Sequence, residues 1–204
     1  MSTITRRSAL TLFASVPAAA AFAWTPAEAE RAAEQAQQSR RTAAERGAAF
    51  TPKFFSAPEY ATVAVLVDLI IPRDDRSGSA TEAGVPEFMD FMMLDQPARQ
   101  TAMRGGLALV DRLSEQRYGR RFVECSDVER RGILDDIAYP STAPASLSQA
   151  VAFFTSFRDL TASGFWTTKM GIADLGYQGN EYVQAWDGCP QPALDKLGVK
   201  YEAK

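Results

Sequence analysis

The 204 residues include 46% hydrophobic side chains, enough to form the core of one domain. The net charge is -3 and no basic stripe is present, which argues against a nucleic-acid-binding protein. The chain contains no histidine, so it lacks the usual general base near neutral pH, the commonest metal ligand and the usual axial ligand of haem. It also contains no Cys-x-x-Cys, dinucleotide-binding or Walker motif. These absences argue against autonomous catalysis.

Residues 1–23 have the pattern of an export signal. Arg6 and Arg7 precede an apolar run, residues 9–22, with an Ala-x-Ala cleavage site at its end. This run is shorter than the roughly 20 residues needed to span a bilayer. The paired arginines resemble a twin-arginine signal, which exports folded proteins, and an ordinary secretory leader is the alternative. Removing the leader leaves 20 basic against 25 acidic residues.

Residues 24–55 are predicted to form an N-terminal helical arm and a linker. The sequence Thr25-Pro26-Ala27-Glu28 is a capping box with proline at the first helical position, and it predicts a helix to about Arg46. The apolar residues of this helix are mostly alanine, which bury little area. We therefore expect an exposed arm, either solvated or lying against a partner. Phenylalanines between residues 50 and 55 are expected to attach the arm to the core.

Residues 56–204 are predicted to form one all-α domain, because apolar residues recur at helical rather than strand spacing. Capping boxes begin helices at Ser56 and Ser126. The helix over residues 56–71 is the most hydrophobic and is the predicted centre of the core; Pro72 ends it. With the arm, about six helices are expected, the others over residues 85–94, 97–118, 126–140 and 147–170, before an irregular, glycine-rich C-terminal segment.

The polar loop over residues 73–84 carries a group of acidic side chains. Asp74, Asp75 and Glu82 are oxygen donors suited to a hard cation, but their spacing does not match a calcium loop. Arg73 and Arg76 also compete as partners for the carboxylates. We therefore expect a solvated loop, and the sequence predicts no metal site.

The C-terminal segment from Asp174 to Pro190 concentrates glycine, aromatic rings, an amide and a thiol. Amphipathic rings are enriched where one protein docks on another. The candidate partner-binding residues are therefore Tyr177, Asn180, Trp186, Cys189 and Pro190. A glycine-rich turn packed on the chain's own helices is the alternative interpretation.

Three motifs in this order resemble the gluconate 2-dehydrogenase subunit 3 family. They are Leu69-Ile-Ile-Pro72 followed by acidic residues, Ala83-Gly-Val-Pro86, and the closing segment from Asp174 to Pro190. The resemblance covers residues 56–190. This family is the small subunit of membrane-associated flavoprotein dehydrogenases that act on sugars and sugar acids.

The resemblance implies a non-catalytic partner of a large FAD-containing subunit of the glucose–methanol–choline oxidoreductase type. It implies no cofactor in this chain, FAD in the partner and, in many complexes, a multihaem cytochrome c as a third subunit. It also implies that the small subunit helps the flavoprotein to fold and carries it through the twin-arginine translocase. The expected location is the periplasm, with membrane association through the complex. The substrate of the partner is not implied.

Two cysteines, Cys125 and Cys189, are present, and an exported chain meets an oxidising compartment. They are able to pair with each other and close a loop of about 65 residues, worth roughly 4 kcal/mol in the chain-entropy model. We favour a disulfide from Cys189 to the large subunit, because this residue lies in the candidate partner-binding segment. Free thiols are the third alternative.

Two other classes of function remain open from the sequence. One is a free-standing exported helical binding protein that uses residues 171–190 to hold a small ligand. The other is a self-sufficient enzyme that uses carboxylates and tyrosine, for which no poised base is visible.

Overall fold

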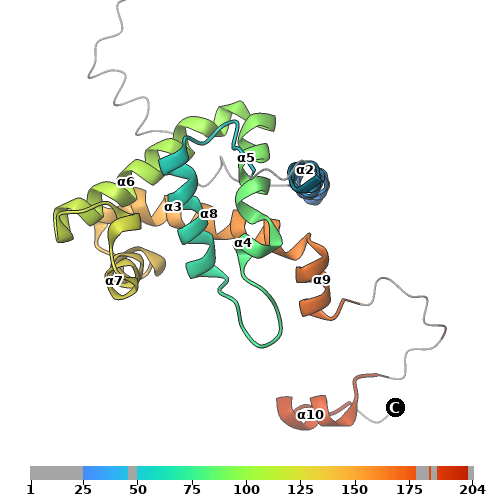
Figure 1. Ribbon diagram of the computed structural model, residues 1–204. Coiled ribbons are helices and arrows are strands. Elements are labelled where there is room, and N and C mark those ends of the chain that lie inside the picture. Colours follow the sequence, from blue (N-terminus) through green and yellow to red (C-terminus); the bar gives the residue numbers. More distant parts are fainter. Residues whose placement is uncertain (1–24, 46–49, 178–183, 185–187, 202–204) are drawn as a thin grey trace, which may run out of the picture.

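The structure, a computed structural model, describes residues 25–45, 50–177, 184 and 188–201 (Figure 1). These residues form helices and contain no strand, which confirms the all-α prediction. The α-helices are α2 (Pro26–Glu45), α3 (Ala57–Ile70), α4 (Ala80–Ala83), α5 (Val85–Asp95), α6 (Gln100–Tyr118), α7 (Asp127–Ala138), α8 (Ser148–Trp166), α9 (Lys169–Leu175) and α10 (Gln191–Leu197). Short 3-10 turns lie at η2 (Pro97–Arg99), η3 (Phe122–Glu124) and η4 (Ala145–Leu147).

The capping boxes begin helices where the sequence predicts them. At the start of α3 the Ser56 backbone N–H donates to Glu59 Oε2 over 2.8 Å, and at α7 the Ser126 N–H donates to Glu129 Oε2 over 2.7 Å. Each bond pairs a carboxylate with a backbone donor that the helix itself cannot satisfy. At its other end α3 stops at Ile70, two residues before Pro72. Local chemistry therefore sets these boundaries.

Helix α8 is the central element of the bundle (Figure 1). The sequence analysis placed the helix over 56–71 at the centre, and α3 does bury Val63, Leu66 and Val67. However, α8 contacts α2, α3, α4, α5, α6, α7 and α9. Its apolar face is wide enough for this because it carries large rings and a leucine, all buried: Phe153, Phe154, Phe157, Leu160 and Phe165.

The crossing of α6 and α8 depends on a glycine. A Cβ atom at Gly106 would lie 1.8 Å from Cδ2 of Phe153, so the phenylalanine ring rests directly on the α6 backbone. Only glycine leaves room for a ring this close to a helix backbone. The neighbouring Gly105 faces open space.

Helix α5 supplies core side chains. Phe88, Met89, Met92 and Met93 are all buried, so this methionine-rich cluster belongs to the interior. Between them Asp90 is also buried, at 2% exposure. The sequence analysis gave this aspartate no role.

Asp90 holds the linker that leads into α3. Its Oδ1 accepts hydrogen bonds from the backbone N–H groups of Phe54 and Phe55, at 2.9 and 3.0 Å, and its Oδ2 accepts one from Lys53 at 2.9 Å. From the other side, Arg104 Nη2 donates to the Phe54 carbonyl over 2.7 Å, and its guanidinium lies 4.5 Å from the centre of the Phe54 ring. Burying a carboxylate is costly unless hydrogen-bond donors replace the lost water, and these bonds provide that replacement.

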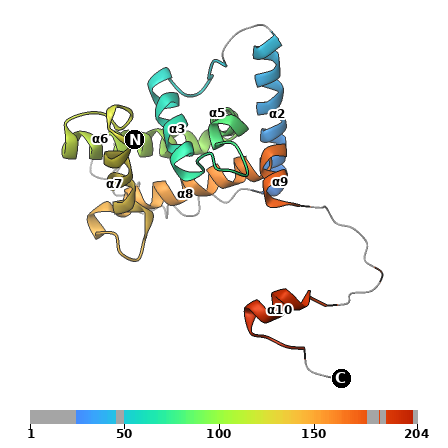
Figure 2. The same cartoon turned by 60° about the horizontal axis from the view of Figure 1, so that its bottom comes forward.

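Helix α2 does not extend into solvent as an arm, contrary to the expectation from its alanine-rich sequence. It packs against α5 and contacts α8 (Figure 2). A stripe of alanines at helical spacing faces the domain. These small side chains allow α2 to approach the neighbouring helices closely. The stripe consists of Ala29, Ala32, Ala33 and Ala36, all buried.

Candidate functional site

The candidate partner-binding segment begins at a sharp corner between α8 and α9. The sequence analysis predicted one helix to about residue 170, but α8 ends at Trp166 and α9 begins at Lys169. The Thr168 hydroxyl donates to the Phe165 carbonyl over 2.7 Å and accepts from the Gly171 N–H over 3.1 Å. One hydroxyl thus pairs with a backbone carbonyl at the end of α8 and with a backbone N–H at the start of α9.

Gly171 fixes how closely α9 approaches α8. A Cβ atom at this position would lie 2.2 Å from the Phe165 carbonyl oxygen, so no larger residue fits without moving backbone. The first turn of α9 therefore lies against the last turn of α8. This geometry comes from tertiary packing, which the helical periodicity of the sequence does not report.

The polar loop before α4 holds the far end of α9. Arg76 donates from Nη2 to the Asp174 carbonyl, and its Nε lies 3.3 Å from Asp174 Oδ1. The loop keeps its shape because Asp74 Oδ1 accepts from the backbone N–H groups of Arg76 and Ser77, at 2.9 and 2.8 Å. Its residues 72–76 are exposed, as expected for a solvated loop, and the loop also supports α9.

Two acidic side chains of this loop, Asp74 and Glu82, are occupied by neighbours in the chain. Bonds from the Ser77 and Arg76 N–H groups lower the pKa of Asp74, and those from the Ser79 N–H and Arg73 lower the pKa of Glu82. Glu82 also forms an ion pair with Arg73. Within the described ranges no group of three or more potential ligands is arranged to hold a metal ion.

The corner presents large apolar side chains to solvent. Leu175 is 62% exposed and Tyr177 54%, while Trp166 and Ile172 are each about 40% exposed. The Trp166 ring stands edge-on to buried Phe165, at 5.0 Å between ring centres, which connects the exposed surface to the core. We call Trp166, Ile172, Leu175 and Tyr177 the α9 patch. Large exposed apolar residues concentrated in one short stretch of chain mark a candidate binding site.

Beyond α9, the segment 188–201 closes on itself around α10. The Cys189 backbone N–H donates to the Tyr201 hydroxyl oxygen over 2.7 Å, and Leu194 is buried inside this closed segment. Leu197, Val199 and Tyr201 are exposed. Both views place α10 apart from the bundle (Figures 1 and 2). The C-terminal segment therefore contains two helices, α9 and α10, that the sequence analysis did not predict.

The predicted partner-binding residues fall into two groups. Tyr177 belongs to the α9 patch, and Cys189 and Pro190 precede α10. Asn180 and Trp186 lie outside the described residues, as do Arg6 and Arg7 of the predicted export signal. The other members of the α9 patch were missed because Trp166 was assigned to the predicted helix that ends near residue 170, and Ile172 and Leu175 to the irregular segment after it. The Thr167-Thr168 pair was the signal for a helix break.

The two cysteines are not bonded to each other. Cys125 is buried, at 3% exposure, and this burial raises the pKa of its thiol. Cys189 is exposed. The intrachain disulfide considered from the sequence is therefore not formed in this structure, and Cys189 is the accessible thiol.

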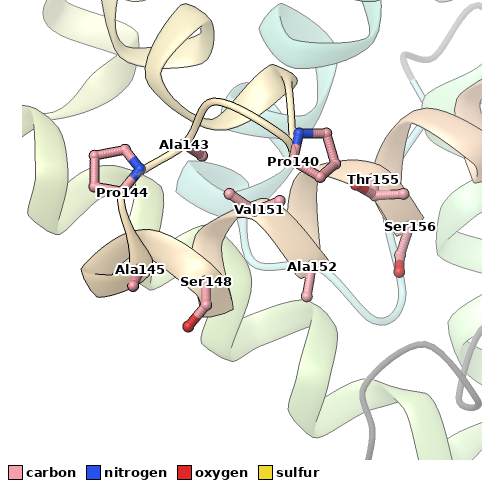
Figure 3. Close-up of a pocket in the computed structure, with 9 residues that line it drawn as sticks. All are labelled: Pro140, Ala143, Pro144, Ala145, Ser148, Val151, Ala152, Thr155 and Ser156. Atoms are coloured by element: carbon pink, nitrogen blue, oxygen red, sulfur yellow. The ribbon is translucent and has the colours of Figure 1, made fainter.

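A shallow hollow of about 370 Å³ lies between the loop after α7 and the first half of α8 (Figure 3). Its walls offer small apolar groups and a few hydroxyls but no charged side chain. Such a lining provides no acid–base pair for chemistry. The lining residues are Pro140, Ala143, Pro144, Ala145, Ser148, Val151, Ala152, Thr155 and Ser156.

Comparison with known families identifies the chain. The family model for gluconate 2-dehydrogenase subunit 3 matches residues 57–188. The chain belongs to this family. Gluconate 2-dehydrogenase subunit 3 is, by its family description, a component of a dehydrogenase complex. The match spans α3 to α9 and leaves α2 and α10 outside it.

No curated protein and no solved structure gave a significant match to the chain. A search of the described residues for helices with the length and hydropathy of a membrane span found none.

Proposed function

We propose that this chain is the non-catalytic accessory subunit of a periplasmic FAD-dependent dehydrogenase of the glucose–methanol–choline type. It binds the large flavoprotein subunit, stabilises it and accompanies it through the twin-arginine translocase. FAD resides in the large subunit, and a cytochrome c subunit completes the complex at the membrane. Membership of the subunit 3 family supports a role in such a complex.

The α9 patch is the observation that carries this proposal. Ile172 and Leu175 are exposed on α9, and Trp166 and Tyr177 flank it. The helix is fixed at both ends, by the Thr168 hydroxyl at the start and by Arg76 at the end. A rigid apolar surface loses little conformational entropy when a partner covers it. Aromatic and aliphatic anchors of this kind commonly provide most of the binding free energy of an interface.

The buried carboxylates support a structural rather than a catalytic role. Asp90 accepts three backbone hydrogen bonds, and Glu87 lies beneath α2 beside Arg40 at 3.5 Å. Neither lines the hollow near α8. A general base has to reach a substrate, and these two groups are committed to packing.

The binding test compares two double variants, each of which replaces two exposed aliphatic residues with glutamine. Ile172→Gln with Leu175→Gln removes two apolar side chains from the α9 patch, whereas Leu94→Gln with Val128→Gln removes two exposed apolar side chains elsewhere. We expect the first to weaken binding of the flavoprotein by about 30-fold, from about 1 kcal/mol for each lost side chain. The control is expected to bind like the unchanged protein.

Affinity is measured by isothermal titration with the purified flavoprotein, which we expect to be encoded beside this chain and to lack an export signal. Circular dichroism of both double variants checks that helix content is unchanged. Equal affinity for the two variants, or no binding of the unchanged chain, contradicts the proposal.

The export role is tested by replacing Arg6 and Arg7 together with lysine. Because only a folded-protein exporter is able to carry a partner already loaded with cofactor, this substitution is expected to leave dehydrogenase activity in the cytoplasm. Undiminished periplasmic activity would show that the chain does not act as the carrier.

Exposed Cys189 is proposed to form a disulfide with the large subunit. Non-reducing electrophoresis of the purified complex is expected to show a band at the summed mass that Cys189→Ser removes and Cys125→Ser retains. Separate subunits without reductant would refute the intersubunit bond.

A further inference from the structure

Helix α2 is held on the domain by weak apolar contact. Its buried face consists of alanines, and a methyl group removes little apolar surface from water. The remaining attachment comes from polar contacts along α2. These polar contacts therefore provide a large part of the free energy that keeps α2 docked.

The polar contact near the C-terminal half of α2 contains a buried carboxyl group. Glu87, in the first turn of α5, is 8% exposed, and its Oε1 lies 3.5 Å from Nε of Arg40 on α2. Arg40 also donates from Nη1 to the Glu82 carbonyl over 2.9 Å. Glu87 Oε2 is buried and accepts no hydrogen bond in the structure. This carboxyl group is therefore only partly satisfied beneath α2.

Two further titratable groups face Glu87. Tyr60 of α3 donates a side-chain hydrogen bond to it, and burial raises the pKa of this phenol well above neutral pH. Asp90 of α5 adds a repulsive negative charge but is fully engaged by backbone N–H groups. The Tyr60 phenol therefore stays neutral when Glu87 ionises.

Other charged groups near α2 have partners of their own. Hydrogen bonds from Thr25 lower the pKa of Glu28, which interacts with Arg99 of η2 near the start of α2. The Glu82 pKa is lowered as well, by hydrogen bonds from the Ser79 backbone N–H and from Arg73. The whole chain contains no histidine.

Burial raises the pKa of Glu87 above its ordinary value. Its own backbone N–H, Arg40 and Tyr60 each lower this pKa, but burial has the larger effect. When α2 leaves, water reaches the carboxyl group and its pKa falls toward the ordinary value. The docked state thus binds a proton more tightly than the undocked state. Docking therefore strengthens as the pH falls toward the undocked pKa and weakens as the pH rises through the docked pKa.

We propose that α2 is a pH-dependent cover on α5, which docks tightly when Glu87 is protonated and loosens when Glu87 is ionised. Each unit by which the docked pKa exceeds the undocked pKa changes the docking equilibrium about tenfold. The change is confined to α2, because Asp90 fixes the linker after it to the core.

The test is backbone hydrogen exchange of the full chain at pH 5 and pH 8, with protection factors corrected for intrinsic exchange. In the unchanged protein, amides of α2 are expected to be less protected at pH 8 than at pH 5, while amides of α8 keep their protection. Glu87→Gln mimics the protonated carboxyl group, so its α2 is expected to be equally protected at both pH values. Gln also preserves the volume beneath α2.

Arg40→Gln provides the complementary variant. It removes the cation that favours ionised Glu87, so the loss of α2 protection between pH 5 and pH 8 is expected to exceed that of the unchanged protein. Two results would overturn the proposal: pH-independent protection of α2 in the unchanged chain, or the same pH-dependent loss in Glu87→Gln. Both results are measured on this chain alone, without any partner protein.

Discussion

Replacing Asp90 with asparagine tests whether this buried carboxylate fixes the linker into α3. Asparagine has the same shape but only one acceptor oxygen. Placed at the Oδ1 position, that oxygen retains the bonds to the N–H groups of Phe54 and Phe55. The amide nitrogen then faces the Lys53 N–H, where two donors meet and one bond is lost.

The magnitude follows from the contacts. A hydrogen bond to a charged group contributes about 1.5–3 kcal/mol, and Lys53 is exposed enough for water to replace part of it. We therefore expect Asp90→Asn to reduce the free energy of unfolding by about 2 kcal/mol. Asp90→Ala removes all three bonds and leaves the buried N–H groups of Phe54 and Phe55 without acceptors. Its expected cost is about 3–5 kcal/mol.

Urea unfolding followed by circular dichroism measures both losses, and thermal melting is expected to show a decrease of about 4–8 °C for Asp90→Asn. Asp95→Asn, an exposed aspartate at the end of the same helix, is the control and is expected to change stability by less than about 0.5 kcal/mol. If Asp90→Asn is as stable as this control, the three bonds do not fix the linker.

Three further outcomes are expected. Gly106→Ala should lower the free energy of unfolding in urea by about 2 kcal/mol, because its Cβ collides with Phe153. Gly105→Ala has open space around it and should raise the free energy of unfolding by about 0.5–1 kcal/mol. Equal effects would refute the close packing of α6 on α8. Ser126→Ala should cost about 1 kcal/mol by removing the cap of α7, and an unchanged midpoint would exclude that role. Iodoacetamide followed by mass spectrometry should modify exposed Cys189 in the native chain and buried Cys125 only after unfolding; rapid native labelling of Cys125 would contradict its burial.

Features set by local chemistry were predictable from the sequence. Capping boxes at Thr25, Ser56 and Ser126 begin α2, α3 and α7 close to where the sequence predicts. The all-α fold also followed, because the apolar residues recur at helical spacing. These signals lie within a few neighbouring residues, so no knowledge of the tertiary structure is required.

Features set by distant contacts were not predictable. The break between α8 and α9 depends on Gly171 meeting the last carbonyls of α8, a contact that periodicity does not encode. The docking of α2 was missed because alanine gives a weak hydrophobic signal. Asp90 was missed because a charged residue among methionines gives no indication that backbone donors from residues 53–55 will surround it.

The candidate site was partly predictable. The composition of residues 174–190 indicated a candidate partner-binding segment, and its Tyr177 lies in the α9 patch. Leu175 and Ile172 were not singled out, because both lie beyond the predicted end of the helix near residue 170, where glycines and aromatic rings gave the stronger signal. Their exposure follows from the orientation of α9, which the corner at Thr168 and the ion pair at Asp174 determine.

The attachment of residues 53–55 also determines how the protein responds to mechanical force. Tension applied at the N-terminal end of α2 acts first on its alanine contacts, which resist little, and is then carried by the linker, which Asp90 and Arg104 hold on the core. There it is divided between α5 and α6, which both pack against α8. Unwinding the 20 residues of α2 lengthens the chain by about 40 Å before the domain is strained. The N-terminal helix thus acts as an extensible tether that allows the end of the chain to be pulled while the bundle stays folded.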